Sequence, residues 1–184
     1  MKKNKDIKKN TKENKLKNNP VPSWDEYFIS MAHFASTKSK DQSTHVGAII
    51  VGKNKEVIST GMNGFVRGLN DNIKERQERP EKYFWMEHAE RNAIYNAARN
   101  GSKLDGTKIY ITAMSCMDCA RAIVQSGIKE VIIDQNKDFE NRNEWNESME
   151  KAIQLYKETG VKLRYFNGKY IKTYKLTRGK KEEL

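Results

Sequence analysis

Two short groups of residues in the middle of the sequence carry side chains that bind metals. His88 and Glu90 are separated by one residue, and Cys116 and Cys119 are separated by two. Cysteines at positions i and i+3 share one face of a helix, and the free N–H groups of a helix N-terminus stabilise their thiolates. One imidazole and two thiolates provide three protein ligands for zinc and leave the fourth tetrahedral position to water. The pattern therefore predicts a catalytic zinc site of His88, Cys116 and Cys119.

Glu90 adds a carboxylate beside that predicted site. Zinc lowers the pKa of a bound water to about 7, and a nearby carboxylate can take the proton and later deliver it to a ring nitrogen and a leaving amine. Two residues along a helix correspond to a rotation of about 200°, so His88 must lie in the first turn and lean back toward the metal. H-x-E followed by P-C-x-x-C is typical of zinc-dependent nucleobase deaminases, and this sequence matches that signature except for Ser115 in place of the proline. We therefore expect hydrolytic removal of an exocyclic amine.

Other interpretations of the same residues have to be weighed. Cys116 and Cys119 could form a redox pair or part of a structural zinc site, but a closed structural site needs a fourth protein ligand, and only His33 and His45 remain as candidates. A zinc module that only binds nucleotides or partners would give no reason for the carboxylate of Glu90. The complete pattern therefore favours catalysis.

The charge of the chain lies at its two ends. Residues 1–19 contain eight lysines and two acidic residues, and residues 162–184 contain eight basic and two acidic residues. The intervening sequence is nearly neutral although the whole chain carries +11. Because lysine-rich terminal runs are commonly disordered, we expect a disordered basic tail at 1–19, one domain at 20–168 and a basic C-terminal tail at 169–184. This distribution makes a dedicated nucleic-acid surface the less favoured interpretation.

The sequence also bears on the compartment. Its N-terminus has no apolar core of a signal peptide, and no run of about 18 apolar residues occurs. Two cysteines three positions apart do not resemble the framework of a disulfide-stabilised secreted domain. We expect a cytoplasmic protein that does not span a membrane.

The order of the predicted elements indicates an α/β fold. Ser23 can cap a helix that runs to about Thr37, and two β-rich runs follow at 46–51 and 56–60. The polar segment 63–82 has no clear period, so we expect a functional or mobile loop there. Helices and strands then alternate: helices at 88–100, 117–126 and 144–158, and strands at 108–113, 131–134 and 161–166. Alternation of this kind predicts a sheet with helices on both faces.

From about Trp24 to Asp134, and more loosely to Phe166, the sequence resembles the deoxycytidylate deaminases of the cytidine deaminase-like superfamily. Besides the zinc pattern, the resemblance is carried by residues 24–28, 39–41, 46–48, 61–65, 119–123 and 127–128. It implies a three-layer α/β/α sandwich with a central mixed sheet of about five strands. It also implies attack of hydroxide on C4 of deoxycytidine monophosphate, release of ammonia, a homo-oligomer and a nucleoside triphosphate effector. Another nucleotide, modified or triphosphorylated, and single-stranded nucleic acid are the alternative substrates.

The resemblance also assigns residues. His88, Cys116 and Cys119 match the zinc ligands, and Glu90 matches the proton shuttle. Asn63 matches the loop asparagine expected near the sugar or base. Separately from the resemblance, a phosphate binder needs cations or N–H donors on loops around the pocket, so Lys40, Ser43 and Arg67 are further candidates for sugar or phosphate contacts. Ala89 is a further candidate for a substrate contact.

The sequence departs from the family pattern at three positions near these residues. Ser115 stands where proline usually precedes the first cysteine, and a serine there can cap the helix that follows. Val66 replaces the usual proline of the substrate loop. Arg91 follows the catalytic glutamate where an apolar residue is common; we expect it either in solvent, at an interface, or in contact with an anionic nucleotide.

Overall fold

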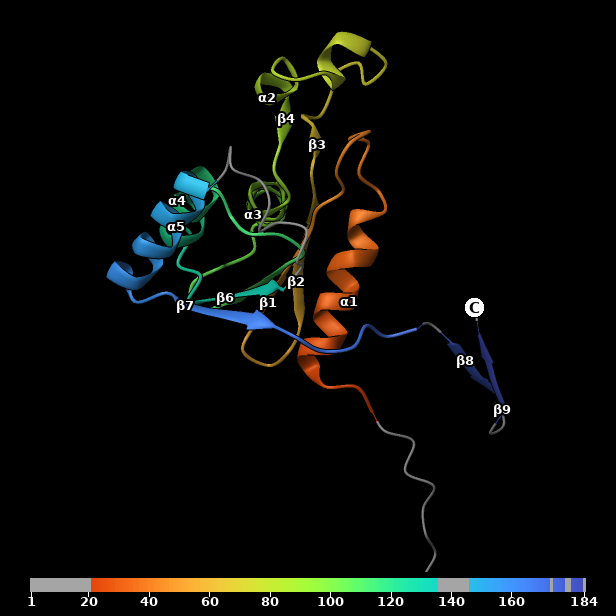
Figure 1. The fold of residues 1–184 in the computed structure, drawn as a ribbon. Helices are drawn as coiled ribbons and strands as arrows, with labels where there is room; N and C mark the ends of the chain where they lie inside the picture. The colour runs from red at the N-terminus through yellow and green to blue at the C-terminus, as the bar shows by residue number, and fades with distance from the viewer. Residues whose placement is uncertain (1–20, 136–145, 173, 178–179, 184) are drawn as a thin grey trace, which may run out of the picture.

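The computed structural model describes residues 21–135, 146–172, 174–177 and 180–183. A sheet of five strands forms its centre, in the spatial order β2-β1-β5-β6-β7 (Figure 1). These strands are β1 Gly47–Val51, β2 Val57–Met62, β5 Lys108–Ile111, β6 Glu130–Asp134 and β7 Lys162–Phe166. The helices around it are α1 Trp24–Ser36, α3 Ala89–Arg99, α4 Met117–Gln125 and α5 Asn146–Thr159.

The sheet is mixed, with both kinds of strand pairing. Strand β1 runs antiparallel to β2 and β5, whereas β5, β6 and β7 run parallel. Every residue of β1 and β6 is buried, because helices cover both faces of these inner strands. The register places Ile50 opposite Ile109, and Ile109 opposite Val131. The C-terminal ends of the parallel strands therefore lie at the same end of the sheet.

Two apolar clusters join the sheet to its helices. On one face, Phe28, Ile29 and Ala32 of α1 pack with Ile49 and Tyr110 of the sheet. On the other face, the cluster includes apolar residues of α3, α4 and α5: Ala89, Ala93, Ala97, Ala120, Ile123, Ala152 and Tyr156. Figure 1 shows α1 on the side of the sheet opposite to these three helices. The three-layer α/β/α prediction is confirmed.

Helix α1 begins where its sequence signals predict. The Ser23 side chain accepts a hydrogen bond from the backbone of Glu26, and the Glu26 carboxylate accepts one from the backbone of Ser23. This capping box satisfies two N–H groups that the helix itself cannot bond. The predicted end near Thr37 agrees with a helix that ends at Ser36.

The segment before α3 contains short regular elements that its sequence does not reveal. They are β3 Gly64–Phe65, the 3₁₀ helix η1 Lys74–Gln77, α2 Lys82–Trp85 and β4 Met86–Glu87. Strands β3 and β4 pair antiparallel, so the segment leaves the sheet and returns to the start of α3 as an arm (Figure 1). Elements of two to four residues are too short to show a hydrophobic period.

The two charged ends differ in what the structure describes. The predicted tail at 1–19 lies outside the described residues. In the C-terminal part, β8 Tyr174–Thr177 and β9 Lys180–Glu183 form an antiparallel hairpin. Before this hairpin, the Tyr170 hydroxyl donates to Asp134 at 2.6 Å, and the backbone N–H of Ile171 donates to Ser30 of α1. Within the described ranges, no helix has both the length and the hydrophobicity needed to span a membrane.

Candidate metal centre and active site

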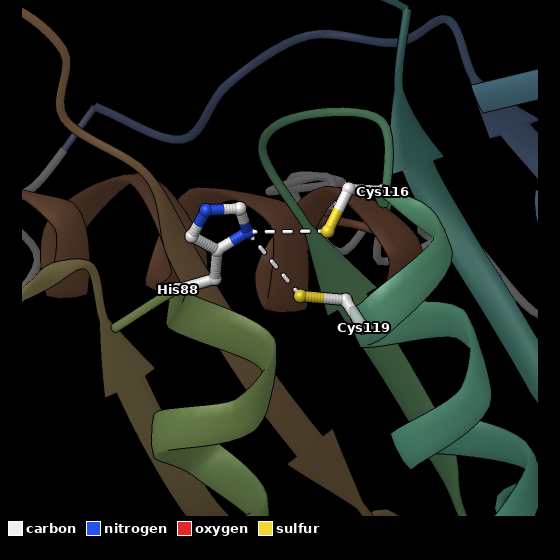
Figure 2. A group of neighbouring side chains, drawn as sticks. All are labelled: His88, Cys116 and Cys119. Carbon is white, nitrogen blue, oxygen red and sulfur yellow. Dashed lines mark hydrogen bonds between the residues drawn. The ribbon is translucent and has the colours of Figure 1, made fainter. Parts of the chain in front are cut away.

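His88, Cys116 and Cys119 lie together at the starts of α3 and α4. The Nδ1 atom of His88 is 3.4 Å from the Sγ atoms of both cysteines, and the three ligand atoms lie within 4.8 Å of one another. Figure 2 shows the imidazole nitrogen facing both sulfurs. A nitrogen at about 2.0 Å and a sulfur at about 2.3 Å from a tetrahedral zinc are about 3.5 Å apart. The observed spacing therefore fits zinc held by these three residues.

The two helix starts bring these side chains together. His88 and Cys116 are the N-cap residues of α3 and α4, and both have extended backbone conformations. Cys119 lies in the first turn of α4, three residues after Cys116, and so shares its face of the helix. Both helix N-termini therefore lie at the centre, where their dipoles stabilise thiolates. The prediction that each motif lies where a loop enters a helix is confirmed.

The pKa values of the two cysteine thiols are shifted in opposite directions. The hydrogen bond from Cys119, with a further one from His88, lowers the pKa of Cys116 to about 3 despite its burial. The same hydrogen bond, together with burial, raises the pKa of the Cys119 thiol well above its usual value. Zinc binds both cysteines as thiolates, so its positive charge would replace the proton that Cys119 retains. The donor set is thus two sulfurs and an imidazole, the soft ligands that zinc prefers.

Glu90 points its carboxyl group into the same region. Its residue is only 3% exposed and lines the same pocket as His88 and Cys116. Burial raises the pKa of Glu90, while the nearby His88 partly opposes this effect. His88 is the N-cap and lies outside the helical phase of α3, so Glu90 at the second helical position can share its side. A desolvated carboxyl group in a pocket has the environment of a proton-transfer group.

The pocket beside this centre is formed by several separate segments. The loop after α1, the arm, the start of α3, the loop after β5, the start of α4 and one residue of α5 all contribute. Its lining residues are Asp41, Thr44, Val46, Asn63, Arg79, Lys82, Tyr83, Met86, Glu87, His88, Ala89, Glu90, Ala113, Met114, Cys116 and Met149.

Asn63 and Ala89, two of the predicted substrate contacts, are part of this wall. The Oδ1 atom of Asn63 accepts a hydrogen bond from the Val46 backbone at 2.8 Å. Its Nδ2 group donates to the Thr44 carbonyl at 2.8 Å and to Asp41 at 3.2 Å. The amide is therefore held in one orientation by the loop that precedes β1.

The other three predicted substrate contacts lie outside the lining residues. Lys40 forms an exposed ion pair with Asp71, and the Arg67 guanidinium donates to Asn96 of α3. The Ser43 hydroxyl accepts a hydrogen bond at 2.7 Å from Lys82, which itself lines the pocket.

Lys82 and Arg79 are pocket residues that the sequence interpretation missed. Lys82 is buried and forms an ion pair with Asp41 at 2.8 Å. A lone lysine beside the aromatic run 83–85, six residues before the metal-binding histidine, is the signal that could have identified it. Arg79 had no such signal, because it belongs to a charged stretch without a period.

Arg91 connects the first turn of α3 with the first turn of α4. Its guanidinium forms an ion pair with Glu87 and lies 3.7 Å from Asp118, the residue between the two cysteines. It does not belong to the residues that line the pocket.

Comparisons with known proteins agree with this architecture. The family model of the cytidine and deoxycytidylate deaminase zinc-binding region matches residues 22–135. Deoxycytidylate deaminase of Mus musculus is 36% identical over 154 residues, which cover 81% of this chain and 83% of the relative. Deoxycytidylate deaminase of Homo sapiens is 33% identical over 148 residues, covering 78% and 79%.

A solved structure extends the likeness to the fold. The crystal structure of dCMP deaminase from the cyanophage S-TIM5 in apo form superposes with a TM-score of 0.62 at 26% identity. The match covers 80% of this chain and 100% of the cyanophage chain. The zinc-binding region, the relatives and the fold agree, and the chain therefore belongs to the zinc-dependent cytidine and deoxycytidylate deaminase family.

Proposed function

We propose that the chain converts deoxycytidine monophosphate (dCMP) and water to deoxyuridine monophosphate (dUMP) and ammonia. The observation that carries this proposal is the meeting of an imidazole, two thiols and a buried carboxyl group at one pocket. The chain around that pocket is 36% identical to a deoxycytidylate deaminase. The amine of cytosine is the group that such a site removes.

Zinc is the cofactor, with His88, Cys116 and Cys119 as its ligands. Bound there, zinc would supply Lewis-acid activation of a water molecule at neutral pH. Among the described residues, three ligands lie together, which is the number that leaves a position for water.

Glu90 moves the protons. Its carboxylate accepts a proton from the attacking water and delivers it to N3 of the cytosine ring. It then takes the remaining hydroxyl proton and gives it to the departing amine, so that C4 keeps the oxygen and ammonia leaves. Because Glu90 is buried, these transfers occur away from bulk water.

Asn63 contributes to recognition of the nucleoside. Its Oδ1 atom accepts one hydrogen bond, from Val46, and a carbonyl oxygen has two lone pairs. The second lone pair is the acceptor for a sugar hydroxyl or a ring substituent. Ala89, which is fully buried, supplies a small apolar part of the same wall.

Arg79 receives the 5′-phosphate. The lining residues contain two strong cations, Lys82 and Arg79, in the described part of the chain. The ammonium group of Lys82 directs its three hydrogen bonds to Asp41 and Ser43, so it has none left for a ligand. Arg79 is exposed and forms no ion pair with another described residue. A guanidinium at the pocket rim can bind a phosphate with two parallel hydrogen bonds.

A substrate panel tests the proposal. The zinc-loaded full chain is incubated with dCMP, deoxycytidine, deoxycytidine triphosphate and single-stranded DNA, and loss of the aminopyrimidine absorbance is followed. We expect kcat/KM to be highest for dCMP. A preference for the triphosphate, for a modified cytosine nucleotide added to the panel, or for the polymer would replace dCMP as the substrate.

The variant Arg79→Gln tests the phosphate assignment within that panel. We expect KM for dCMP to rise about tenfold, since one charge-assisted contact is lost, while turnover of deoxycytidine stays unchanged. Lys40→Gln, which alters an exposed cation outside the pocket, is the matched control. An equal loss with both substrates would contradict the role of Arg79 in phosphate binding.

Assembly, regulation and compartment complete the proposal. We infer a homo-oligomer, an allosteric nucleoside triphosphate and a cytoplasmic location, where reducing conditions keep the two cysteines available to zinc. The mass of the native protein in solution and the effect of added deoxycytidine triphosphate on dCMP turnover test the first two.

A further inference from the structure

The first turn of α4, which carries both cysteines of the metal centre, has no side-chain oxygen at its own cap. Cys116, and not Ser115, occupies the N-cap position of this helix. An N-cap residue usually provides a side-chain oxygen for the free N–H groups of the first turn, which is why serine, threonine, aspartate and asparagine are preferred there. The sulfur of Cys116 instead faces the Nδ1 atom of His88 at 3.4 Å (Figure 2). Because the N-cap side chain is a metal ligand, the turn needs a hydrogen-bond acceptor from elsewhere.

Ser148 of α5 supplies that acceptor. Its Oγ atom accepts a hydrogen bond at 2.9 Å from the backbone N–H of Met117, the first residue of α4. The two residues are 31 positions apart in the sequence, so the cap comes from a second helix and not from the segment that precedes α4. A hydroxyl group accepts this bond without a charge, so it adds no negative charge beside the two thiolates.

The packing of α5 against α4 holds Ser148 in place. Ser148, Ala152 and Tyr156 follow one another at intervals of four residues and therefore share one face of α5. Ala152 and Tyr156 are buried in the same apolar cluster as Ile123 of α4. Figure 1 shows the two helices side by side. Ser148 lies at the end of α5 that reaches the pocket, since the next residue, Met149, lines it.

We propose that Ser148 is a positioning residue of the metal centre, whose hydroxyl group fixes the first turn of α4 and thereby the two sulfurs that bind zinc. The inference deepens the proposed function, because it rests on Cys116 and Cys119 as zinc ligands. Loss of the bond leaves the Met117 N–H without its partner, so the turn frays and both sulfurs move. Zinc binding must then restore the turn, and the apparent affinity falls with the fraction of molecules in which the turn is formed.

Zinc affinity measures the contribution of Ser148 directly. Dissociation constants are determined for the full chain without substrate, by competition with a chromophoric chelator. Ser148→Ala removes the acceptor, and we expect the dissociation constant to rise about tenfold, as is typical when a group that orients a metal ligand is lost. Ser148→Thr keeps a hydroxyl group, and we expect its dissociation constant to stay within about twofold of that of the parent.

Ser126→Ala is the matched control. Ser126 is the C-cap residue of the same helix, and its hydroxyl donates to the Ile123 carbonyl at 2.9 Å. The substitution weakens α4 at the end away from the cysteines, so we expect a lower denaturation midpoint and an unchanged zinc dissociation constant. An unchanged dissociation constant in Ser148→Ala, or an equal rise in Ser126→Ala, would overturn the proposal.

Hydrogen exchange separates failure of this inference from failure of the proposed function, because it requires neither zinc nor turnover. Exchange of the Met117 amide is followed by NMR in the zinc-free chain. We expect it to be about tenfold faster in Ser148→Ala than in the parent, because the amide has lost its acceptor, and unchanged in Ser126→Ala. Equal rates in Ser148→Ala and the parent would show that Ser148 does not hold the turn. A parent that exchanges slowly at Met117 but binds no zinc would contradict the proposed function and not the cap.

Discussion

Lys82 and Asp41 form a buried ion pair in which the ammonium group lies 2.8 Å and 3.0 Å from the two carboxylate oxygens. The same carboxylate accepts a hydrogen bond from the Asn63 amide and others from the backbone of Ser43 and Thr44. One carboxylate therefore joins the loop before β1, the start of the arm and α2. All three segments contribute residues to the wall of the pocket that His88 and Cys116 also line.

Breaking this buried ion pair should strongly reduce the free energy of unfolding. Lys82→Met leaves Asp41 buried without its cation, and removing one partner of a buried pair costs about 3 to 5 kcal/mol. We expect urea denaturation of the zinc-loaded chain to show a loss of this size, and KM to rise because Asn63 loses its fixed orientation.

Two variants serve as controls for this prediction. Lys40→Met breaks the exposed pair with Asp71, which we expect to cost about 0 to 1 kcal/mol. The double variant Asp41→Asn with Lys82→Met should recover part of the stability, because no buried charge remains. Equal effects of Lys82→Met and Lys40→Met would contradict the structural role of the buried pair.

Two carboxyl groups bound by Arg164 should make the stability of the fold depend on pH. Arg164 of β7 donates to Asp25 of α1 at 2.8 Å and to Glu130 of β6 at 2.5 Å. The hydrogen bond from Arg164 lowers the pKa of Asp25. Although burial raises the pKa of Glu130, Lys108 and Arg164 outweigh this effect and lower it. Both carboxyl groups therefore have lower pKa values in the folded chain than in the unfolded chain.

The sign of the effect follows from these two directions. The unfolded chain binds more protons than the folded chain below about pH 5, so the stabilisation is complete above the unfolded pKa values and is lost as the pH falls through the folded ones. We expect the free energy of unfolding to decline on acidification, and Arg164→Met to be less stable at pH 7 with a weaker decline. Denaturant titrations from pH 7 to pH 3 measure this. Parallel curves for the parent and Arg164→Met would contradict the prediction.

Substitutions of Glu90 and of Cys119 should distinguish proton transfer from metal binding. We expect Glu90→Gln to keep a full complement of zinc and to lose about 10² to 10⁴ in kcat, the usual contribution of a general acid–base group. Cys119→Ala should lose both zinc and activity, because two ligands remain. Metal analysis after dialysis, together with an ammonia assay, distinguishes the two variants. Loss of zinc in Glu90→Gln, or unchanged turnover, would remove the assigned role of Glu90.

Zinc should also contribute to stability through binding to the folded chain. Because His88 lies 28 residues before Cys116 in the sequence, the complete site exists only when the chain is folded, and bound metal then stabilises the fold by mass action. We expect a chelator to lower the denaturation midpoint of the parent and to leave that of Cys119→Ala unchanged.

The sequence by itself predicted helices on both faces of a sheet, and it singled out His88, Cys116 and Cys119, which the structure brings together as possible zinc ligands, and the nearby Glu90. His88 and Cys116 are recognisable from the H-x-E and C-x-x-C patterns, which lie at the starts of two helices, and the spacing within one helix turn places Cys119 on the same face as Cys116. Helix and strand periods likewise arise from local backbone geometry, so the predicted elements agree with the observed ones within a few residues.

Only the tertiary structure decided which polar residues form the pocket wall. Lys40 and Arg67 are cations beside the substrate motifs in sequence, yet they pair with Asp71 and Asn96 away from the pocket, whereas Lys82 meets Asp41 across 41 residues. The direction of a side chain in a loop has no period and depends on partners distant in sequence, which is why packing and not local pattern assigned these residues.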